Sequence, residues 1–138
     1  MNPVMSLRPQ PPSKPTLLLV EDDFPIRWTA AEFLRAAGYT VVEAVDVDEA
    51  LTVLLAEKPI DAVFSDLHLP GDRGGEFLSA WLEKHRPHVP MLLTSGKNDG
   101  AALMVGHNPL RRFVIKPYDL PEVAGLLQSM LGVAMSNP

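Results

Sequence analysis

Cysteine is absent from this 138-residue chain, which excludes a disulfide framework and any metal site built from thiolates. Long apolar runs are also missing. The longest have only a few residues, whereas a helix that crosses a membrane needs about 20. The N-terminus likewise has no continuous apolar core of the kind found in signal peptides. These absences favour a cytoplasmic protein with no membrane association.

Positive charge is scarce as well. Twelve Lys and Arg residues stand against 17 Asp and Glu residues, giving a net charge of −5, so direct nucleic-acid binding is not expected. No glycine-rich phosphate loop follows the first apolar run, which disfavours a nucleotide or flavin site. The 46% of hydrophobic residues suits one domain with its own core.

Proline is concentrated at the start of the chain, where it provides five of the first 15 residues. Because proline cannot donate a backbone hydrogen bond, residues 1–15 are expected to form a flexible tail. The folded domain is expected over residues 16–132. Residues 133–138 are expected to form a short C-terminal tail.

Strand-like and helix-like patterns alternate from Thr16 onward. Short apolar runs, typical of strands in a buried parallel sheet, occupy residues 16–20, 40–44, 62–65, 90–93 and 112–115. Helical spacing of apolar residues is found over 26–37, 47–55, 77–85 and 120–131, and a short helix is expected at 98–105. Five strand–helix units predict an α/β fold, a three-layer α/β/α sandwich around a five-stranded parallel sheet. The second strand has polar ends and is expected at an edge.

Acidic residues follow two of these strands: Glu21, Asp22 and Asp23 come after the first, and Asp66 after the third. The carboxyl ends of parallel strands gather at one edge of the sheet. Two charges about 4 Å apart repel by roughly 4 kcal/mol, so such a cluster must take up protons or a cation, and its oxygens suit Mg²⁺. An isolated acidic triplet is more often a solvated turn, and Asp23 also suits a helix N-terminus. The residues that end the other strands favour the metal site.

A hydroxyl and an ammonium group follow the fourth and fifth strands. Thr94 would donate to a phosphoryl oxygen there, although a bond to nearby backbone is the commoner role of a single Thr. Lys116 would emerge at the same edge, pair with Asp66 and contact a phosphoryl oxygen as a point charge. The bond to Pro117 suits a cis peptide in this turn. The sequence thus indicates one site for a divalent cation and a phosphoryl group.

Four motifs in this order resemble the receiver domain of two-component response regulators, the CheY-like family, over about residues 16–132. They are Leu17-Leu18-Leu19-Val20-Glu21-Asp22-Asp23, Asp66-Leu67-His68-Leu69-Pro70-Gly71, Thr94-Ser95-Gly96 and Phe113-Val114-Ile115-Lys116-Pro117. The resemblance implies a flavodoxin-like sheet with strand order 2-1-3-4-5. It also implies that Asp66 accepts a phosphoryl group whose oxygens Thr94 and Lys116 bind. The implied Mg²⁺ ligands are the carboxylates of Glu21, Asp22 and Asp66 and the backbone carbonyl of His68.

The resemblance further implies partners. The phosphoryl donor would be a sensor histidine kinase or a histidine phosphotransfer protein, and Ile26 and Trp28 on the first helix form a candidate donor patch. A partly covered surface position is the commoner role for Trp28. Phe113 would turn inward after phosphorylation and switch the surface that a downstream protein target reads, although an ordinary buried aromatic is equally expected there. We expect a monomer or a weak phosphorylation-dependent dimer. The only chemistry expected is phosphorylation and dephosphorylation of the receiver itself, so the protein is not an enzyme acting on other substrates.

Some residues depart from the family pattern. Arg73 stands where many relatives carry Asp or a small polar residue, and Gly74-Gly75 replaces a glycine followed by an apolar residue. The loop between Leu69 and Glu76 is therefore expected to be looser or differently shaped.

Two other functions remain open. Haloacid-dehalogenase-like phosphatases also use an aspartate nucleophile, but they place a second Asp where this chain has His68. A degenerate receiver acting as a constitutive adaptor is disfavoured by the intact motif residues. Few residues follow the last helix, which slightly favours a stand-alone protein over a receiver excised from a hybrid kinase.

Overall fold

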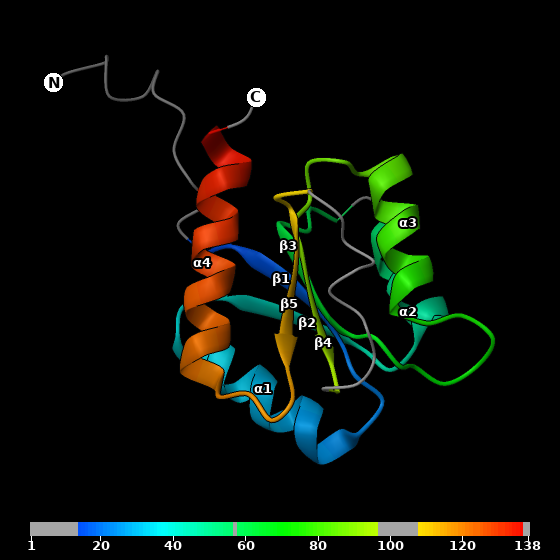
Figure 1. The fold of residues 1–138 in the computed structure, drawn as a ribbon, viewed down its shortest axis with the longest axis horizontal. Coiled ribbons are helices and arrows are strands. Elements are labelled where there is room, and N and C mark those ends of the chain that lie inside the picture. Colours follow the sequence, from blue (N-terminus) through cyan, green and yellow to red (C-terminus); the bar gives the residue numbers. More distant parts are fainter. Residues whose placement is uncertain (1–13, 57, 97–107, 137–138) are drawn as a thin grey trace, which may run out of the picture.

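The chain folds into a parallel β-sheet covered on both faces by helices (Figure 1). The computed structural model describes residues 14–56, 58–96 and 108–136. In chain order its elements are β1 (Thr16–Val20), α1 (Phe24–Ala36), β2 (Thr40–Ala44), α2 (Val47–Leu55), β3 (Ala62–Asp66), α3 (Gly75–His85), β4 (Met91–Ser95), β5 (Arg111–Ile115) and α4 (Leu120–Ser136).

The sheet has the order β2-β1-β3-β4-β5, and every neighbouring pair is parallel. This confirms the three-layer α/β architecture, the flavodoxin-like strand order and the position of β2 at an edge. Every residue of β3 and β4 is buried. Continuous apolar runs form these strands because helices cover both of their faces.

Successive side chains of each strand enter two separate cores. Leu17 and Phe64 pack with α1 and α4 on one face of the sheet, while Leu18 and Val63 pack with α2 and α3 on the other. The same division of the helices is visible in Figure 1. Full burial of one such Leu or Phe side chain stabilises the fold by about 1.5–3 kcal/mol. The two cores fix the strands in register, and the register fixes the edge where the strands end.

Asp23 is the N-cap of α1. Its Oδ1 accepts a hydrogen bond from the backbone N–H of Ile26 at 3.1 Å, and Pro25 lies in the first turn. Both features favour a helix that begins at this point. The capping role that the sequence left open for Asp23 is therefore confirmed, and Glu21 and Asp22 remain as the acidic residues available to a site.

Two glycines bring the start of α3 against the end of β3. A Cβ on Gly75 would lie 2.8 Å from the backbone oxygen of Asp66, and a Cβ on Gly74 would lie 2.8 Å from that of Leu67. Arg73 pairs with Asp48 at the start of α2, and its guanidinium lies 4.5 Å from the centre of the Phe77 ring. The loop that was expected to be looser is thus anchored at its end by close backbone packing and by Arg73.

Three expectations need comment. The prediction of a short C-terminal tail was wrong for residues 133–136, because α4 continues to Ser136. Gly132 is the poorest helix former between Leu131 and that end, and its cost of about 1 kcal/mol is small for a packed helix of 17 residues. The helix expected at 98–105 lies outside the described residues, as do residues 1–13 of the expected tail. No helix in the described part of the chain is long and apolar enough to cross a membrane.

Replacing Gly75 with Ala should lower the free energy of unfolding by about 1–3 kcal/mol, because the new Cβ would press on the backbone of β3. Urea unfolding measures this change. Gly125→Ala in α4 is the matched control, since its Cβ would meet no atom within 4 Å. That variant should be neutral or more stable by up to about 1 kcal/mol. Equal loss of stability in both variants would contradict the proposed close approach.

Candidate functional site

Three carboxylates meet at the carboxyl edge of the sheet. Strands β1 and β3 are neighbours with Val20 beside Ser65, so the residues that come next, Glu21 and Asp66, also lie side by side. Asp22 joins them from the loop after β1. One carboxylate oxygen from each of the three residues lies within 4.8 Å of the others. The convergence predicted from the strand order is confirmed.

Two of these carboxylates are withdrawn from water. Glu21 is 5% exposed and Asp66 is 7% exposed, whereas Asp22 faces solvent. Burial raises the pKa of Glu21, and the negative charge of Asp66 raises it further, although a hydrogen bond from the backbone N–H of Asp23 to Oε2 at 3.1 Å opposes the shift. Buried like charges are costly unless a cation compensates them.

Lys116 provides one positive charge. Its Nζ donates to Oδ2 of Asp66 at 2.8 Å. Burial lowers the pKa of Lys116, but the hydrogen bond and charge of Asp66, together with the charges of Glu21 and Asp22, outweigh that effect and leave the pKa above its usual value. Among the described residues of the site, one ammonium group thus faces three carboxylates, which leaves a surplus of negative charge. The peptide bond from Lys116 to Pro117 is cis, as the turn suggested.

Backbone hydrogen bonds extend the sheet past the ends of its strands. Leu67 N–H donates to the carbonyl of Thr94 at 2.9 Å, and Lys116 N–H donates to that of Ser95 at 2.8 Å. Thr94 pairs directly with Asp66 across the sheet and is 2% exposed. Strand β3 continues to Asp66 and β4 to Ser95, so both strands end slightly later than expected. Asp66 and Thr94 are therefore strand residues, and the sheet holds them rigidly.

The loop after β3 turns back over the carboxylate. The backbone N–H of His68 donates to Oδ1 of Asp66 at 3.1 Å. This contact keeps the His68 peptide beside the site, while the role of its carbonyl as a metal ligand stays a prediction. Oδ1 of Asp66 thus accepts from the loop, and Oδ2 accepts from Lys116.

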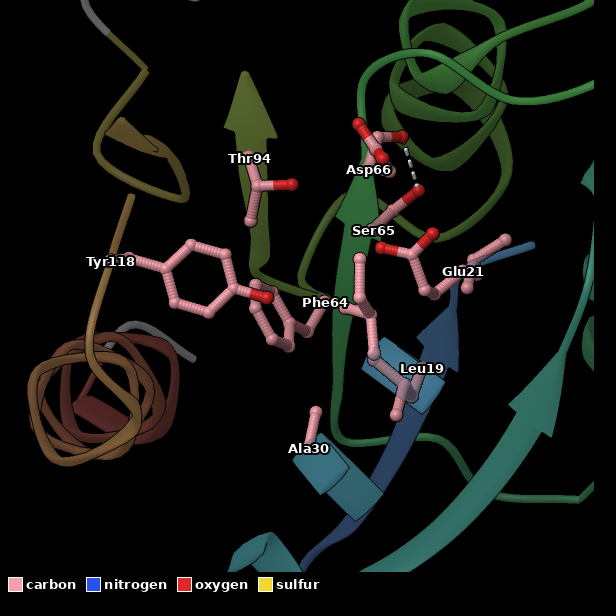
Figure 2. Close-up of a pocket in the computed structure, with 10 residues that line it drawn as sticks. Leu19, Glu21, Ala30, Phe64, Ser65, Asp66, Thr94 and Tyr118 are labelled. Atoms are coloured by element: carbon pink, nitrogen blue, oxygen red, sulfur yellow. Dashed lines mark hydrogen bonds between the residues drawn. The ribbon is translucent and has the colours of Figure 1, made fainter. Parts of the chain in front are cut away.

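A small cavity lies next to the carboxylates, with Thr94 and Tyr118 in its wall (Figure 2). Its volume is about 10 Å³, at the lower limit for one water molecule. The Tyr118 ring packs edge-on against Phe64, with 5.9 Å between ring centres. Burial first, and then the charges of Glu21 and Asp66, raise the pKa of Tyr118 to about 12. Its hydroxyl therefore keeps its proton to a higher pH than that of an ordinary tyrosine.

The donor set fits Mg²⁺. Carboxylate oxygens are hard ligands, the cluster carries more negative charge than Lys116 compensates, and Asp22 leaves one side of the site open to solvent. Mg²⁺ is usually held by a few carboxylates and keeps several waters, so a partly open site of this kind suits it. The same opening would admit a phosphoryl oxygen beside Asp66.

Comparison with known proteins decides the family. A model of the response regulator receiver domain matches residues 17–128, which is most of the chain. This chain belongs to the response regulator receiver domain family. The five-stranded order and the acidic site at the carboxyl edge are thus those of a two-component receiver.

Related receivers occur in proteins of several kinds. The chain is 33% identical over 122 residues to the phosphate regulon transcriptional regulatory protein PhoB of Pseudomonas aeruginosa, covering 84% of this chain and 51% of that protein. It is 32% identical over 118 residues to the sensor kinase CckA of Brucella abortus, covering 84% of this chain and 12% of CckA. This receiver spans about half or less of the length of the curated relatives described here.

Solved structures of receiver domains have the same fold as this chain. The crystal structure of the receiver domain of the hybrid histidine kinase CckA has a TM-score of 0.69 and 32% identity, covering 84% of this chain and 98% of that chain. The signal receiver domain of an HD domain-containing protein from Pseudomonas fluorescens Pf-5 has a TM-score of 0.80 and 28% identity, covering 94% of this chain and 95% of that chain.

The sequence did not single out two residues that border this site, Arg27 and Tyr118. An arginine in the first turns of an amphipathic helix is normally a solvated surface residue. A tyrosine just before a helix carries no pattern that would place its ring beside a strand-end carboxylate. Only the tertiary packing of α1 and of the segment after β5 brings them to the site.

Replacing Glu21 with Gln should raise the free energy of unfolding of the metal-free protein at neutral pH. Between the usual pKa of 4.5 and the raised pKa of the folded state, folded wild type binds more protons than the unfolded chain, so its stability falls as pH rises through that window. The variant should lose this pH dependence and also lose much of the stabilisation that Mg²⁺ gives wild type. Urea titrations across pH, with and without Mg²⁺, measure both effects.

Glu32→Gln is the control, because Glu32 is exposed on α1 and surface ion pairs contribute little. It should follow wild type at every pH and Mg²⁺ concentration. A Glu21→Gln variant less stable than wild type at neutral pH without metal would contradict the electrostatic interpretation.

Proposed function

We propose that this receiver accepts a phosphoryl group on Asp66, with Mg²⁺ bound beside it, and that phosphorylation alters a surface read by a protein target. One observation carries the proposal: Oδ2 of the buried Asp66 lies 2.8 Å from Lys116 Nζ, and Asp66, Glu21 and Asp22 bring their carboxylates together. A purely structural ion pair would not need two additional carboxylates, and that of Glu21 adds to the cost because it is buried as well.

The donor would be a phosphohistidine on a sensor histidine kinase or a histidine phosphotransfer protein. An oxygen of Asp66 would attack the phosphorus, the P–N bond would break, and its electron pair would return to the imidazole, which then takes a proton from solvent. Hydrolysis would later transfer the phosphoryl group to water and restore the Asp66 carboxylate. The receiver would thus promote only its own phosphorylation and dephosphorylation.

Each site residue has a distinct part in this transfer. Glu21, Asp22, Asp66 and the backbone carbonyl of His68 would hold Mg²⁺, which when bound offsets the charge of the carboxylates and of the phosphoryl oxygens. Lys116 would move from its bond with Asp66 to a transferred oxygen, and the Thr94 hydroxyl would donate to another. Positioning and charge neutralisation would supply most of the rate.

The response would start at Thr94. A hydroxyl drawn toward the phosphoryl group would shift the end of β4, whose next partner in the sheet is β5. Phe113 on β5 lies beside Leu93 and is half-buried, at the wall of a surface pocket of about 120 Å³. An inward turn of Phe113 would change the surface around β5 and α4. A local change in charge would then bias two arrangements of one segment.

The donor would approach over α1. A groove of about 460 Å³ lies between α1 and the segment from Lys116 to Leu120, and Ile26 lines both this groove and the small cavity beside Asp66. Trp28 is 53% exposed but is only two residues away, and such residues face different sides of a helix. The expected patch is therefore divided, and Ile26 is the part nearest the site.

Intact-mass measurement after incubation with acetyl phosphate and Mg²⁺ tests the proposed chemistry. Wild type should gain one phosphoryl group, and the adduct should disappear with a chelator or in Asp66→Asn. Asp72→Asn, which changes an exposed acid in the loop after β3, is the matched control and should be labelled like wild type. Failure to label wild type would favour a constitutive adaptor, and turnover of an aryl phosphate would favour a phosphatase.

Replacing Ile26 with Asp should slow phosphotransfer from a phosphorylated histidine donor by at least tenfold, with a much smaller effect on labelling by acetyl phosphate. The groove would lose apolar contact area needed only by a protein donor. Leu55→Asp is the control, because Leu55 is 67% exposed on α2, on the opposite face of the sheet. Equal slowing with both phosphoryl donors would reject the docking role of Ile26.

A further inference from the structure

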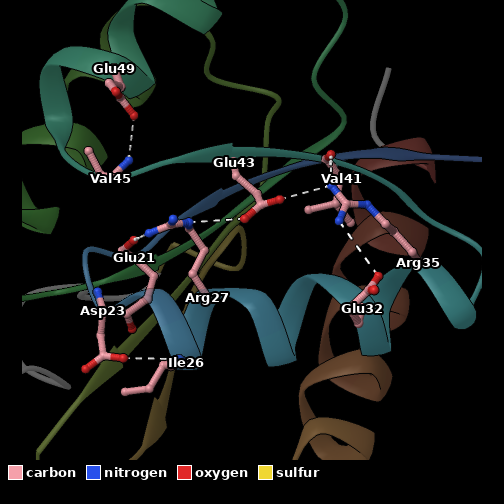
Figure 3. Close-up of polar contacts among 10 residues, drawn as sticks. All are labelled: Glu21, Asp23, Ile26, Arg27, Glu32, Arg35, Val41, Glu43, Val45 and Glu49. Carbon is pink, nitrogen blue, oxygen red and sulfur yellow. Dashed lines mark hydrogen bonds and ion pairs between the residues drawn. The ribbon is translucent and has the colours of Figure 1, made fainter.

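Arg27 reaches from α1 back to the turn that carries two of the acidic residues. Its Nη1 donates to the backbone carbonyl of Glu21 at 2.9 Å, and its Nε donates to the Glu43 carboxylate on β2 at 3.1 Å (Figure 3). The Arg27 side chain is only 13% exposed. This geometry differs from that of a solvated surface arginine, because the planar guanidinium contacts two fixed groups at once.

The carbonyl that Arg27 holds belongs to the peptide unit joining Glu21 to Asp22. The N–H of Glu21 donates to the carbonyl of Ala44 at 3.0 Å, so β2 fixes one side of this residue and Arg27 fixes the other. Rotation of that peptide unit would swing the two carboxylates relative to each other. With both sides held, the backbone from which the Glu21 and Asp22 side chains project is fixed before any ion binds.

Glu43 orients the guanidinium. One of its oxygens accepts from Arg27, and the other accepts from Nη2 of Arg35 at 3.2 Å. The Arg35 side chain is 41% exposed, and its Nη2 also donates to the backbone carbonyl of Val41 at 3.0 Å. Arg35 therefore braces α1 against β2 at a distance from the acidic turn, while Arg27 contacts the turn directly (Figure 3).

We propose that Arg27 is a positioning residue for the divalent-cation site, acting through the backbone carbonyl of Glu21; this inference rests on the proposed function. Its charge and its geometry have opposite consequences. As a nearby cation, Arg27 repels Mg²⁺, so its removal would tighten metal binding if charge dominated. As a support of the Glu21–Asp22 peptide, it pre-organises the ligands, so its removal weakens binding.

Mn²⁺ titration followed by electron paramagnetic resonance of the free ion separates these effects without requiring phosphorylation. Arg27→Met keeps the length of the side chain but removes the charge and both hydrogen bonds, and it should raise the Mn²⁺ dissociation constant at least fivefold. Arg27→Lys retains the charge but cannot make both contacts, so it should fall between Arg27→Met and wild type. Glu43→Gln should weaken binding less than Arg27→Met, since the bond to the carbonyl remains.

Arg35→Met is the matched control. The substitution removes the same charge from the same helix and also breaks a hydrogen bond to Glu43, but Arg35 makes no hydrogen bond to Glu21 of the kind that Arg27 makes. Its dissociation constant should stay within twofold of wild type. Circular dichroism must show each variant folded at the temperature of the titration, and Arg27→Lys and Glu43→Gln carry the test if Arg27→Met does not fold.

The outcomes separate two failures. Equal or tighter Mn²⁺ binding by Arg27→Met, with wild type binding normally, would overturn the positioning role and leave the proposed function intact. A parallel loss of affinity in Arg35→Met would also overturn it, because helix placement in general would then be responsible. Wild type that binds no Mn²⁺ would reject the proposed function and this inference with it.

Discussion

Repulsion among three carboxylates at one edge of the sheet is the interaction on which this structure depends. Glu21, Asp22 and Asp66 bring oxygens within 4.8 Å of one another, and two of these residues are almost fully buried. At such distances each pair costs several kcal/mol in a partly buried setting. Lys116 offsets part of this cost. The remainder is the charge that a bound divalent cation would offset, and a change in charge at Asp66 would alter it.

The fold has to hold these groups together against that repulsion. It does so with backbone, which side-chain charges cannot easily displace. The end of β1 is bonded to β2 and the end of β3 to β4, the N-terminus of α3 packs through Gly75 onto the backbone of Asp66, and Arg27 fixes the carbonyl of Glu21. Two apolar cores, one on each face of the sheet, keep the strands in register beneath the site. Stability elsewhere thus maintains a locally unfavourable arrangement of charge.

Much of this arrangement could be predicted from the sequence. Continuous apolar runs gave the strands, and the parallel topology required their polar ends to meet, so the gathering of Glu21, Asp66, Thr94 and Lys116 at one edge needed no contact information. Asp23 was ambiguous between a ligand and a cap, because an acid at a helix start suits both. Only the hydrogen bond from the N–H of Ile26 decided in favour of the cap.

Other features depend on tertiary packing and could not be predicted. The role of Arg27 requires the side chain of one helix to reach both the end of a neighbouring strand and an edge strand, and no spacing in the sequence encodes that reach. Gly75 looked like a cause of looseness in its loop, yet it permits a tight approach of α3 to β3. The length of α4 was underestimated: the expected helix ended at Leu131, just before Gly132, whereas the helix continues to Ser136.

Anomalous diffraction from crystals soaked in Mn²⁺ tests the central claim most directly. One peak is expected, bonded to carboxylate oxygens of the acidic cluster and to the carbonyl of His68, at about the 2.1 Å that Mg²⁺ takes to oxygen. A peak bound elsewhere on the molecule, with Asp66 still paired to Lys116 and no ion beside it, would contradict the claim that the surplus negative charge at this edge exists to hold a cation.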